Sequence, residues 1–194
     1  MKHVPINKWY DANYDDELVE LRKKADDLCF LYNHTMPSNY VEKERIMKNL
    51  FPNCGKRVTI LAPVYADYGY YTYIGNDTYI NHNAYFMDGG TIQIGEHCFI
   101  GPNCGFYTAN HPILASERNL GYEIAKPIII EDDVWIGADV TILPGVTIGK
   151  GSVIGAKSLV TKNIPSNVVA FGNPCRVVRE ITEEDKLKVG DFDE

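Results

Sequence analysis

The residues from 130 to 160 decide the fold, and they read IEDDVWIGADVTILPGVTIGKGSVIGAKSLV. Every sixth position of this stretch is an isoleucine or a valine, at Ile130, Ile136, Ile142, Ile148, Ile154 and Val160. This period fits neither a helix, which repeats every 3.6 residues, nor an uninterrupted strand, which alternates every two. It is typical of the hexapeptide repeat of a parallel β-helix, in which the chain turns a corner at each repeat. We therefore expect a mainly β solenoid with these aliphatic side chains stacked inside it.

The same period occurs earlier in the chain, at Ile74, Ile80, Phe86, Ile94, Ile100 and Phe106. The phase shifts at Asp88-Gly89-Gly90, which predicts a small excursion between these two runs. A longer break, from about residue 107 to residue 126, contains turn chemistry such as His111-Pro112. Because long loops are uncommon in compact domains unless they are functional, we expect this insertion to carry function.

Three segments are expected along the chain. Residues 1–55 have helical spacing, with one helix over about 18–32 and a second from about Ser38 to Phe51. Residues 56–172 form the β-helix with its insertion, and residues 173–194 form a turn followed by a short charged helix or tail. The N-terminal helices can bury little alone, so we expect them to pack on the first coils or on a neighbouring subunit.

The composition argues against several classes of function and location. The net charge of -7 argues against general nucleic-acid binding, which requires a basic face. No apolar stretch approaches membrane-spanning length and the N-terminus lacks a signal-peptide core, so we expect a cytoplasmic protein. The five cysteines form no Cys-x-x-Cys pair, which favours reduced, packed thiols over disulfides or zinc ligands.

The charges are unevenly distributed. No Asp or Glu occurs between Val140 and Arg179, and the cations of this region are Lys150, Lys157, Lys162, Arg176 and Arg179. The C-terminal coils of an acidic protein are thus locally cationic, as an anionic ligand would require. A solvated face that happens to lack acids is the alternative.

Several short motifs follow one another along the chain. They include Tyr10-Asp-Ala-Asn13, Tyr32-Asn-His34, Tyr79-Ile-Asn81, Asn110-His-Pro112, Val134-Trp-Ile-Gly137, Pro144-Gly145-Val146 and Gly172-Asn-Pro174. In these motifs and their order the chain resembles the maltose and galactoside O-acetyltransferases over nearly its whole length, the helical N-terminus included. The resemblance implies a left-handed parallel β-helix and a homotrimer with active sites between subunits. It also implies transfer of the acetyl group of acetyl-CoA to a hydroxyl of a sugar-like acceptor, with no metal required.

Two residues of the insertion match catalytic positions of the family. Transfer to a hydroxyl needs a base, and neutral imidazole suits this role near pH 7, so His111 is the expected general base. Glu123 matches a position that is glutamate in many maltose-type members and methionine in the galactoside type. A carboxylate there would fix the histidine tautomer and stabilise the imidazolium, although Glu123 could also be a solvent-facing loop acid. No cysteine or serine is placed as an acyl carrier, so we expect direct transfer.

The matched acceptor-binding positions are Asp11, Asn13, Asp67 and Asn81. Carboxylates and amides suit a polyol, whose hydroxyls both donate and accept hydrogen bonds. Asp67 stands where galactoside members have serine, and Gly89 stands where they have a second aspartate. These two differences depart from the galactoside type.

The matched donor-binding positions are Trp135, Ala138, Ala156, Thr161, Lys162, Arg176 and Arg179. Backbone amides at the alanines would contact the pantetheine arm of CoA, and the three cations would face its phosphates. The cationic region found from composition falls on the same coils. Trp135 could equally fill a subunit interface.

Three alternatives remain at the level of sequence. The acceptor could be an amine or an antibiotic. The protein could be a zinc hydrolyase that resembles γ-type carbonic anhydrase, with His82, His97 and His111 as ligands, although their spacing does not match and we expect His82 and His97 to be structural. It could also be a non-catalytic trimeric scaffold.

Overall fold

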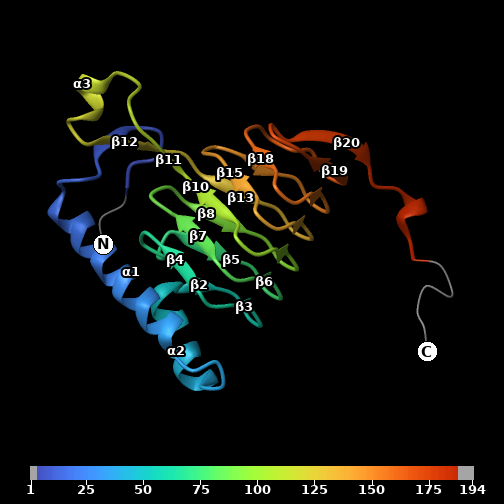
Figure 1. The fold of residues 1–194 in the computed structure, drawn as a ribbon, viewed down its shortest axis with the longest axis horizontal. Helices are drawn as coiled ribbons and strands as arrows, with labels where there is room; N and C mark the ends of the chain where they lie inside the picture. Colours follow the sequence, from blue (N-terminus) through green and yellow to red (C-terminus); the bar gives the residue numbers. More distant parts are fainter. Residues whose placement is uncertain (1–3, 188–194) are drawn as a thin grey trace.

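Successive coils of the chain stack into a three-sided prism, and each face is a sheet of parallel strands, with one antiparallel strand at the C-terminal end. Helices cover the N-terminal end (Figure 1). The structure is a computed structural model that describes residues 4–187. Face I contains β2 (Asn53–Cys54), β5 (Thr72–Ile74), β8 (Ile92–Ile94), β13 (Ile128–Ile130) and β16 (Thr147–Ile148). Face II contains β3 (Thr59–Ile60), β6 (Tyr79–Ile80), β9 (Phe99–Ile100), β14 (Trp135–Ile136), β17 (Val153–Ile154), β19 (Val168–Phe171) and β20 (Arg176–Glu180). Face III contains β4 (Val64–Ala66), β7 (Ala84–Met87), β10 (Gly105–Tyr107), β15 (Thr141–Ile142) and β18 (Leu159–Val160).

The six-residue period has the predicted structural meaning. Ile136 pairs in register with Ile100 on the coil before it and with Ile154 on the coil after it, and all three side chains are buried. Gly137 follows at the corner, where an added Cβ would lie 2.7 Å from the backbone nitrogen of Ala156 on the next coil. The aliphatic residue therefore fills the prism, and the glycine lets neighbouring coils approach at the corner. The expected parallel β-helix is confirmed.

The N-terminal segment covers the open end of the prism. Helix α1 (Asp16–His34) begins after Asp15, whose side chain accepts from the backbone N–H of Leu18. Helix α2 (Tyr40–Leu50) has Asn39 as its N-cap, one residue after the predicted Ser38. After α2, the ring of Phe51 packs edge to face on Phe86 at a centroid distance of 5.4 Å. The two expected helices are thus present, and they pack on the first coils.

The insertion is more ordered than an irregular loop. It contains β11 (Ala109–Asn110), the short helix α3 (Ala115–Arg118) and β12 (Tyr122–Ala125). β12 pairs antiparallel with β11 on one side and with β1 (Trp9–Asp11), from the N-terminus, on the other. Figure 1 shows this small sheet beside the prism, with the loop that carries α3 projecting outward.

The C-terminal segment contains a strand that was not predicted. The chain turns at Gly172 and comes back as β20, which pairs antiparallel with β19 and so satisfies part of the last strand's open edge. At the position of the short charged helix or tail expected from about residue 181, the described residues contain a short 3₁₀ helix at Glu183–Asp185. The run Arg176-Val177-Val178 contains strand-forming residues, but its pairing can be predicted only when the position of the β19 edge is known.

Other expectations concern cysteines, metals and membranes. All five cysteines are free thiols. No group of three or more histidine, cysteine or acidic side chains within residues 4–187 is arranged to hold a metal ion, so His82, His97 and His111 do not converge. His82 Nδ1 contacts the carbonyl of Ala62, and His97 lies between Asp77 and Asp133. No helix in residues 4–187 is both long and apolar enough to cross a bilayer.

Candidate active site

His111 lies where the insertion leaves its small antiparallel sheet. It follows directly after β11, and its ring is exposed. The Nδ1 atom of His111 is 3.0 Å from the backbone carbonyl oxygen of Tyr122 on β12. A carbonyl oxygen only accepts hydrogen bonds, so this contact requires the proton on Nδ1 and leaves the lone pair of the neutral ring on Nε2. The Tyr122 carbonyl thus orients the imidazole of His111 without the help of a carboxylate.

Glu123 has a different partner from the one considered at the level of sequence. The hydroxyl of Tyr10 donates to Glu123 Oε1, and the two residues are directly opposite in the β1–β12 pair. Burial and the neighbouring carboxylate raise the pKa of Tyr10 well above its usual value. Among residues 4–187, the structure gives His111 the Tyr122 carbonyl as its partner and gives Glu123 the Tyr10 hydroxyl.

Asp67 lies near Glu123 at the corner between faces III and I. Its Oδ1 accepts a hydrogen bond of 2.6 Å from the hydroxyl of Tyr85. Burial raises the pKa of Asp67, the Tyr85 hydrogen bond lowers it, the charge of Glu123 raises it further and Arg22 lowers it. Arg22, on α1, donates to the hydroxyl of Tyr68 at 2.7 Å. This corner thus combines two carboxylates, phenolic hydroxyls and one guanidinium.

The excursion at Asp88-Gly89-Gly90 forms the inner wall of this corner. Asp88 is fully buried and accepts from the N–H of Tyr68 at 2.8 Å and the hydroxyl of Thr72 at 3.0 Å. Burial raises its pKa to about 7 even though these bonds lower it. The carboxylate of Asp88 therefore binds groups of the protein itself. Gly89, the next residue, borders Glu123.

The two N-terminal acceptor candidates lie in the turn after β1. Asp11 Oδ1 accepts from the backbone N–H of Asn13 at 3.1 Å and of Tyr14 at 2.8 Å. Asp11 therefore stabilises the turn between β1 and α1, and the side chain of Asn13 is exposed next to it.

Within one chain, Asn81 lies apart from the other acceptor candidates. It follows β6, at the corner between faces II and III, and its N–H donates to the carbonyl of Ile100 at 2.9 Å. The same bond repeats at this corner on later coils, which stacks Asn81 in line with the turns that contain Ala138 and Ala156. Face III therefore separates Asn81 from Asp67, and Asn81 shares its corner with two of the donor candidates.

The remaining donor candidates surround the C-terminal coils. Trp135 is 56% exposed on face II, beside Phe99 on the neighbouring strand. Thr161 and Lys162 follow β18 at the corner between faces III and I, whereas Arg176 and Arg179 lie on β20. Both terminal nitrogens of Arg179 bond the carboxylate of Asp185, at 2.8 and 2.7 Å.

Part of the cationic region is neutralised. Lys150 Nζ lies 3.5 Å from Asp132 and 3.2 Å from Asp133, two acids that precede the region in sequence. No carboxylate within residues 4–187 pairs with Lys157, Lys162 or Arg176, so these three cations of the region are left for an anion.

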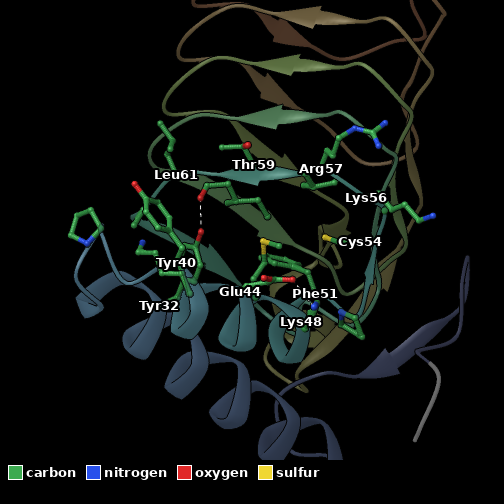
Figure 2. Close-up of a pocket in the computed structure, with 18 of the residues that line it drawn as sticks. Tyr32, Tyr40, Glu44, Lys48, Phe51, Cys54, Lys56, Arg57, Thr59 and Leu61 are labelled. Carbon is green, nitrogen blue, oxygen red and sulfur yellow. Dashed lines mark hydrogen bonds and ion pairs between the residues drawn. The ribbon is translucent and has the colours of Figure 1, made fainter.

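A cavity of about 830 Å³ lies elsewhere, between α2 and the first coil (Figure 2). Tyr32, Phe51 and Cys54 line its apolar part, and the ammonium of Lys43 sits over the ring of Tyr32 at 4.2 Å. None of the residues predicted to bind donor or acceptor lines it, and neither does His111. It is therefore separate from the corner described above.

Comparisons with known proteins agree with the fold. The maltose acetyltransferase hexapeptide capping motif matches residues 7–55, the hexapeptide repeat of succinyl-transferase matches residues 91–108, and the bacterial transferase hexapeptide matches residues 127–162. A maltose O-acetyltransferase from Clostridium difficile 630 has a solved structure that is 44% identical, with a TM-score of 0.88 over 91% of this chain and 94% of that one. The chain belongs to the maltose and galactoside O-acetyltransferase family.

Two further relatives extend the comparison for this acetyltransferase. A galactoside acetyltransferase solved in complex with coenzyme A is 40% identical, with a TM-score of 0.90 over 96% of this chain and 93% of that one. A Staphylococcus aureus (strain MRSA252) protein named as an acetyltransferase is 52% identical over 177 residues, which cover 91% of this chain and 89% of its own.

Sequence reasoning missed several polar residues of this acetyltransferase's III–I corner. They are Tyr10, Arg22, Tyr68 and Tyr85. The density of tyrosines between residues 65 and 85 was a signal, but it did not distinguish sugar contacts from packing. Tyr10 belongs to the motif Tyr10-Asp-Ala-Asn13, in which only Asp11 and Asn13 were predicted as site residues.

Proposed function

We propose that this acetyltransferase moves the acetyl group of acetyl-CoA to a hydroxyl of a sugar-like acceptor by direct transfer, with His111 as general base. The observation that carries the proposal is the 3.0 Å contact between His111 Nδ1 and the Tyr122 carbonyl. It supports the tautomer with the proton on Nδ1, which leaves Nε2 to take a proton from the acceptor. An exposed ring on an ordered arm also suits a group that must reach a bound substrate.

The chemistry needs few groups from the chain. Nε2 of His111 takes the proton of the acceptor hydroxyl as that oxygen bonds to the thioester carbonyl carbon. The carbon–sulfur bond then breaks, and the imidazolium returns the proton to the sulfur of CoA. The Tyr122 carbonyl stabilises the imidazolium by accepting from Nδ1 throughout.

The III–I corner is the proposed acceptor site. Asp67 and Glu123 supply carboxylate oxygens that can accept hydrogen bonds from the acceptor. Such a set suits a polyol. The two carboxylates beside a single arginine also favour an amine-bearing acceptor as the second candidate, since an ammonium group would balance their charge.

The donor site is proposed along the II–III corner. The turns at Ala138 and Ala156 present backbone to a pantetheine arm, and exposed Trp135 lies on the adjoining face. Arg176, on β20, would bind phosphate there, and Lys162, at the III–I corner, would reach the phosphates from a second copy of the chain.

A complete site then requires a second copy of the chain. Asn81 and the alanine turns lie at one corner, whereas His111 and Asp67 lie at another, so within one chain the two halves do not meet. Tyr79, Phe99, Trp135, Val153 and Val169 form an outward row along face II, with Phe99 and Trp135 more than half exposed. An exposed apolar row of this kind is typical of an interface and supports the homotrimer.

The test follows release of CoA from acetyl-CoA with a thiol reagent, against a panel of sugars, amino sugars and simple alcohols. His111→Ala should lower turnover by roughly 10²–10⁴-fold, the range for a general base. His34→Ala is a matched control, because His34 Nδ1 also contacts a backbone carbonyl, that of Phe30, but lies at the end of α1. Equal turnover in His111→Ala and the wild type would exclude the proposed base.

A further inference from the structure

The hydroxyl of Tyr10 is a buried polar group that the proposed transfer does not itself use. Tyr10 is 9% exposed, and its hydroxyl donates to Glu123 across the β1–β12 pair. Its pKa is raised by burial and by Glu123, so the phenol remains protonated and continues to donate throughout the working pH range. A permanent donor that bonds a carboxylate fixes the position of that carboxylate.

Gly89 shows how closely this pair is fitted. A Cβ added at Gly89 would lie 3.0 Å from Glu123 Oε1 and 3.0 Å from the Tyr10 hydroxyl. Gly89 is not among the glycines with positive φ, unlike Gly69 at +68°, so its backbone conformation does not require glycine. A side chain at this position would therefore require the Tyr10–Glu123 pair to move.

The register of the small sheet places this pair beside the histidine. Asn110 is opposite Ile124 at the end of the β11–β12 pair, and His111 follows it. The Nδ1 atom of His111 contacts the carbonyl of Tyr122, the residue before Glu123. Tyr10 is opposite Glu123 on the other side. The strand that carries Glu123 thus lies between Tyr10 and His111.

Only one oxygen of Glu123 is engaged. Tyr10 bonds Oε1, and no donor within residues 4–187 bonds Oε2. The Nδ1 atom of His111 is already occupied by the Tyr122 carbonyl, so His111 does not need Glu123 to orient it. Asp67, the other acid of the corner, is engaged by Tyr85 in the same manner.

We propose that Tyr10 is a positioning residue of the acceptor site: its hydroxyl holds one oxygen of Glu123 against Gly89 and so presents the other oxygen, beside His111, to an acceptor hydroxyl or amine. The inference rests on the proposed function and deepens it. Glu123 then acts in acceptor binding, and Gly89 sets the room available to the pair.

The experiment compares Tyr10→Phe with Tyr32→Phe. Tyr32 is also a buried tyrosine, and its hydroxyl donates to the Ile60 carbonyl at 2.5 Å near the first coil, away from the site. Tyr10→Phe should raise the acceptor KM about tenfold, the effect of one lost charge-assisted hydrogen bond, and should leave the acetyl-CoA KM unchanged. Tyr32→Phe should change neither KM.

A second variant tests the same contact from the other side. Gly89→Ala should displace the pair and raise the acceptor KM as Tyr10→Phe does. The double variant should be no worse than the more affected single variant, because both substitutions disrupt one interaction. Thermal unfolding of each variant checks that it remains folded.

The outcomes separate this inference from the proposed function. An unchanged acceptor KM in Tyr10→Phe, or an equal rise in Tyr32→Phe, overturns the role of Tyr10 while the histidine mechanism stands. Full turnover in His111→Ala overturns the mechanism, whereas a KM effect of Tyr10→Phe in the same assay would still support acceptor positioning. A wild-type protein that acetylates no hydroxyl or amine overturns both.

Discussion

Lys162 and Lys150 provide a sharp test of the donor site, because composition treats them alike and the structure does not. Both belong to the cationic region of the C-terminal coils. Lys150 lies within ion-pair distance of Asp132 and Asp133, at 3.5 and 3.2 Å, and follows a strand of face I. Lys162 follows β18 on face III and has no carboxylate partner within residues 4–187.

The expected effect of Lys162→Gln follows from the lost charge. A hydrogen bond to a charged group contributes about 1.5–3 kcal/mol, and each 1.4 kcal/mol is a factor of ten in affinity. Because the Lys162 side chain is exposed, solvent screening favours the lower end of this range. We expect the KM for acetyl-CoA to rise about tenfold.

Lys150→Gln is the matched control. It removes the same charge from a side chain that is 58% exposed, and surface ion pairs of this kind contribute about 0–1 kcal/mol to stability. The acetyl-CoA KM should stay within about twofold of the wild type. The assay is steady-state CoA release at low and high salt, and the difference between the variants should shrink at high salt. Equal KM values for the two variants would refute a specific phosphate contact at Lys162.

Three further predictions concern the fold. Ile136→Ala should lower the free energy of unfolding by about 2–5 kcal/mol because Ile136 is fully buried, whereas Ile113→Ala, at 95% exposure, should change it by less than about 0.5 kcal/mol in the same urea titration. Gly137→Ala should cost about 1–3 kcal/mol, because its Cβ would meet backbone at 2.7 Å, and a neutral result by thermal unfolding would contradict the coil spacing. The pKa of Asp88 is raised from 3.8 to about 7, so the folded state binds more protons than the unfolded chain between these values, and stability falls as pH rises through this window. Asp88→Asn should therefore be stabilised relative to wild type more at pH 7 than at pH 5, and an equal difference at both would exclude the titration of Asp88.

The parts of the structure that repeat were readable from sequence. The interior positions Ile100, Ile136 and Ile154 could be assigned because each coil uses the same local rule, with an inward aliphatic residue and then a small residue at the corner. Both N-terminal helices were also expected, since apolar spacing and capping residues act within a few turns. The family match located His111 inside the insertion.

The parts that depend on a distant partner were not readable. β20 was not predicted, because its strand character appears only once the edge of β19 is available to it. The insertion was expected as a loop because the third strand of its sheet, β1, comes from the N-terminus. Neither partner leaves a periodic signal in the sequence.

The sequence by itself determined that this chain is a hexapeptide solenoid of the maltose and galactoside O-acetyltransferase family, because both the repeat and the motifs are local patterns. Tertiary structure alone decided which side chains meet. Tyr10 and Glu123 are 113 residues apart and bond across two strands. Asp67 and Asn81, close in sequence, lie at different corners of the prism because the chain turns between them. Contacts of this kind depend on how the coils stack, and no spacing along the chain encodes them.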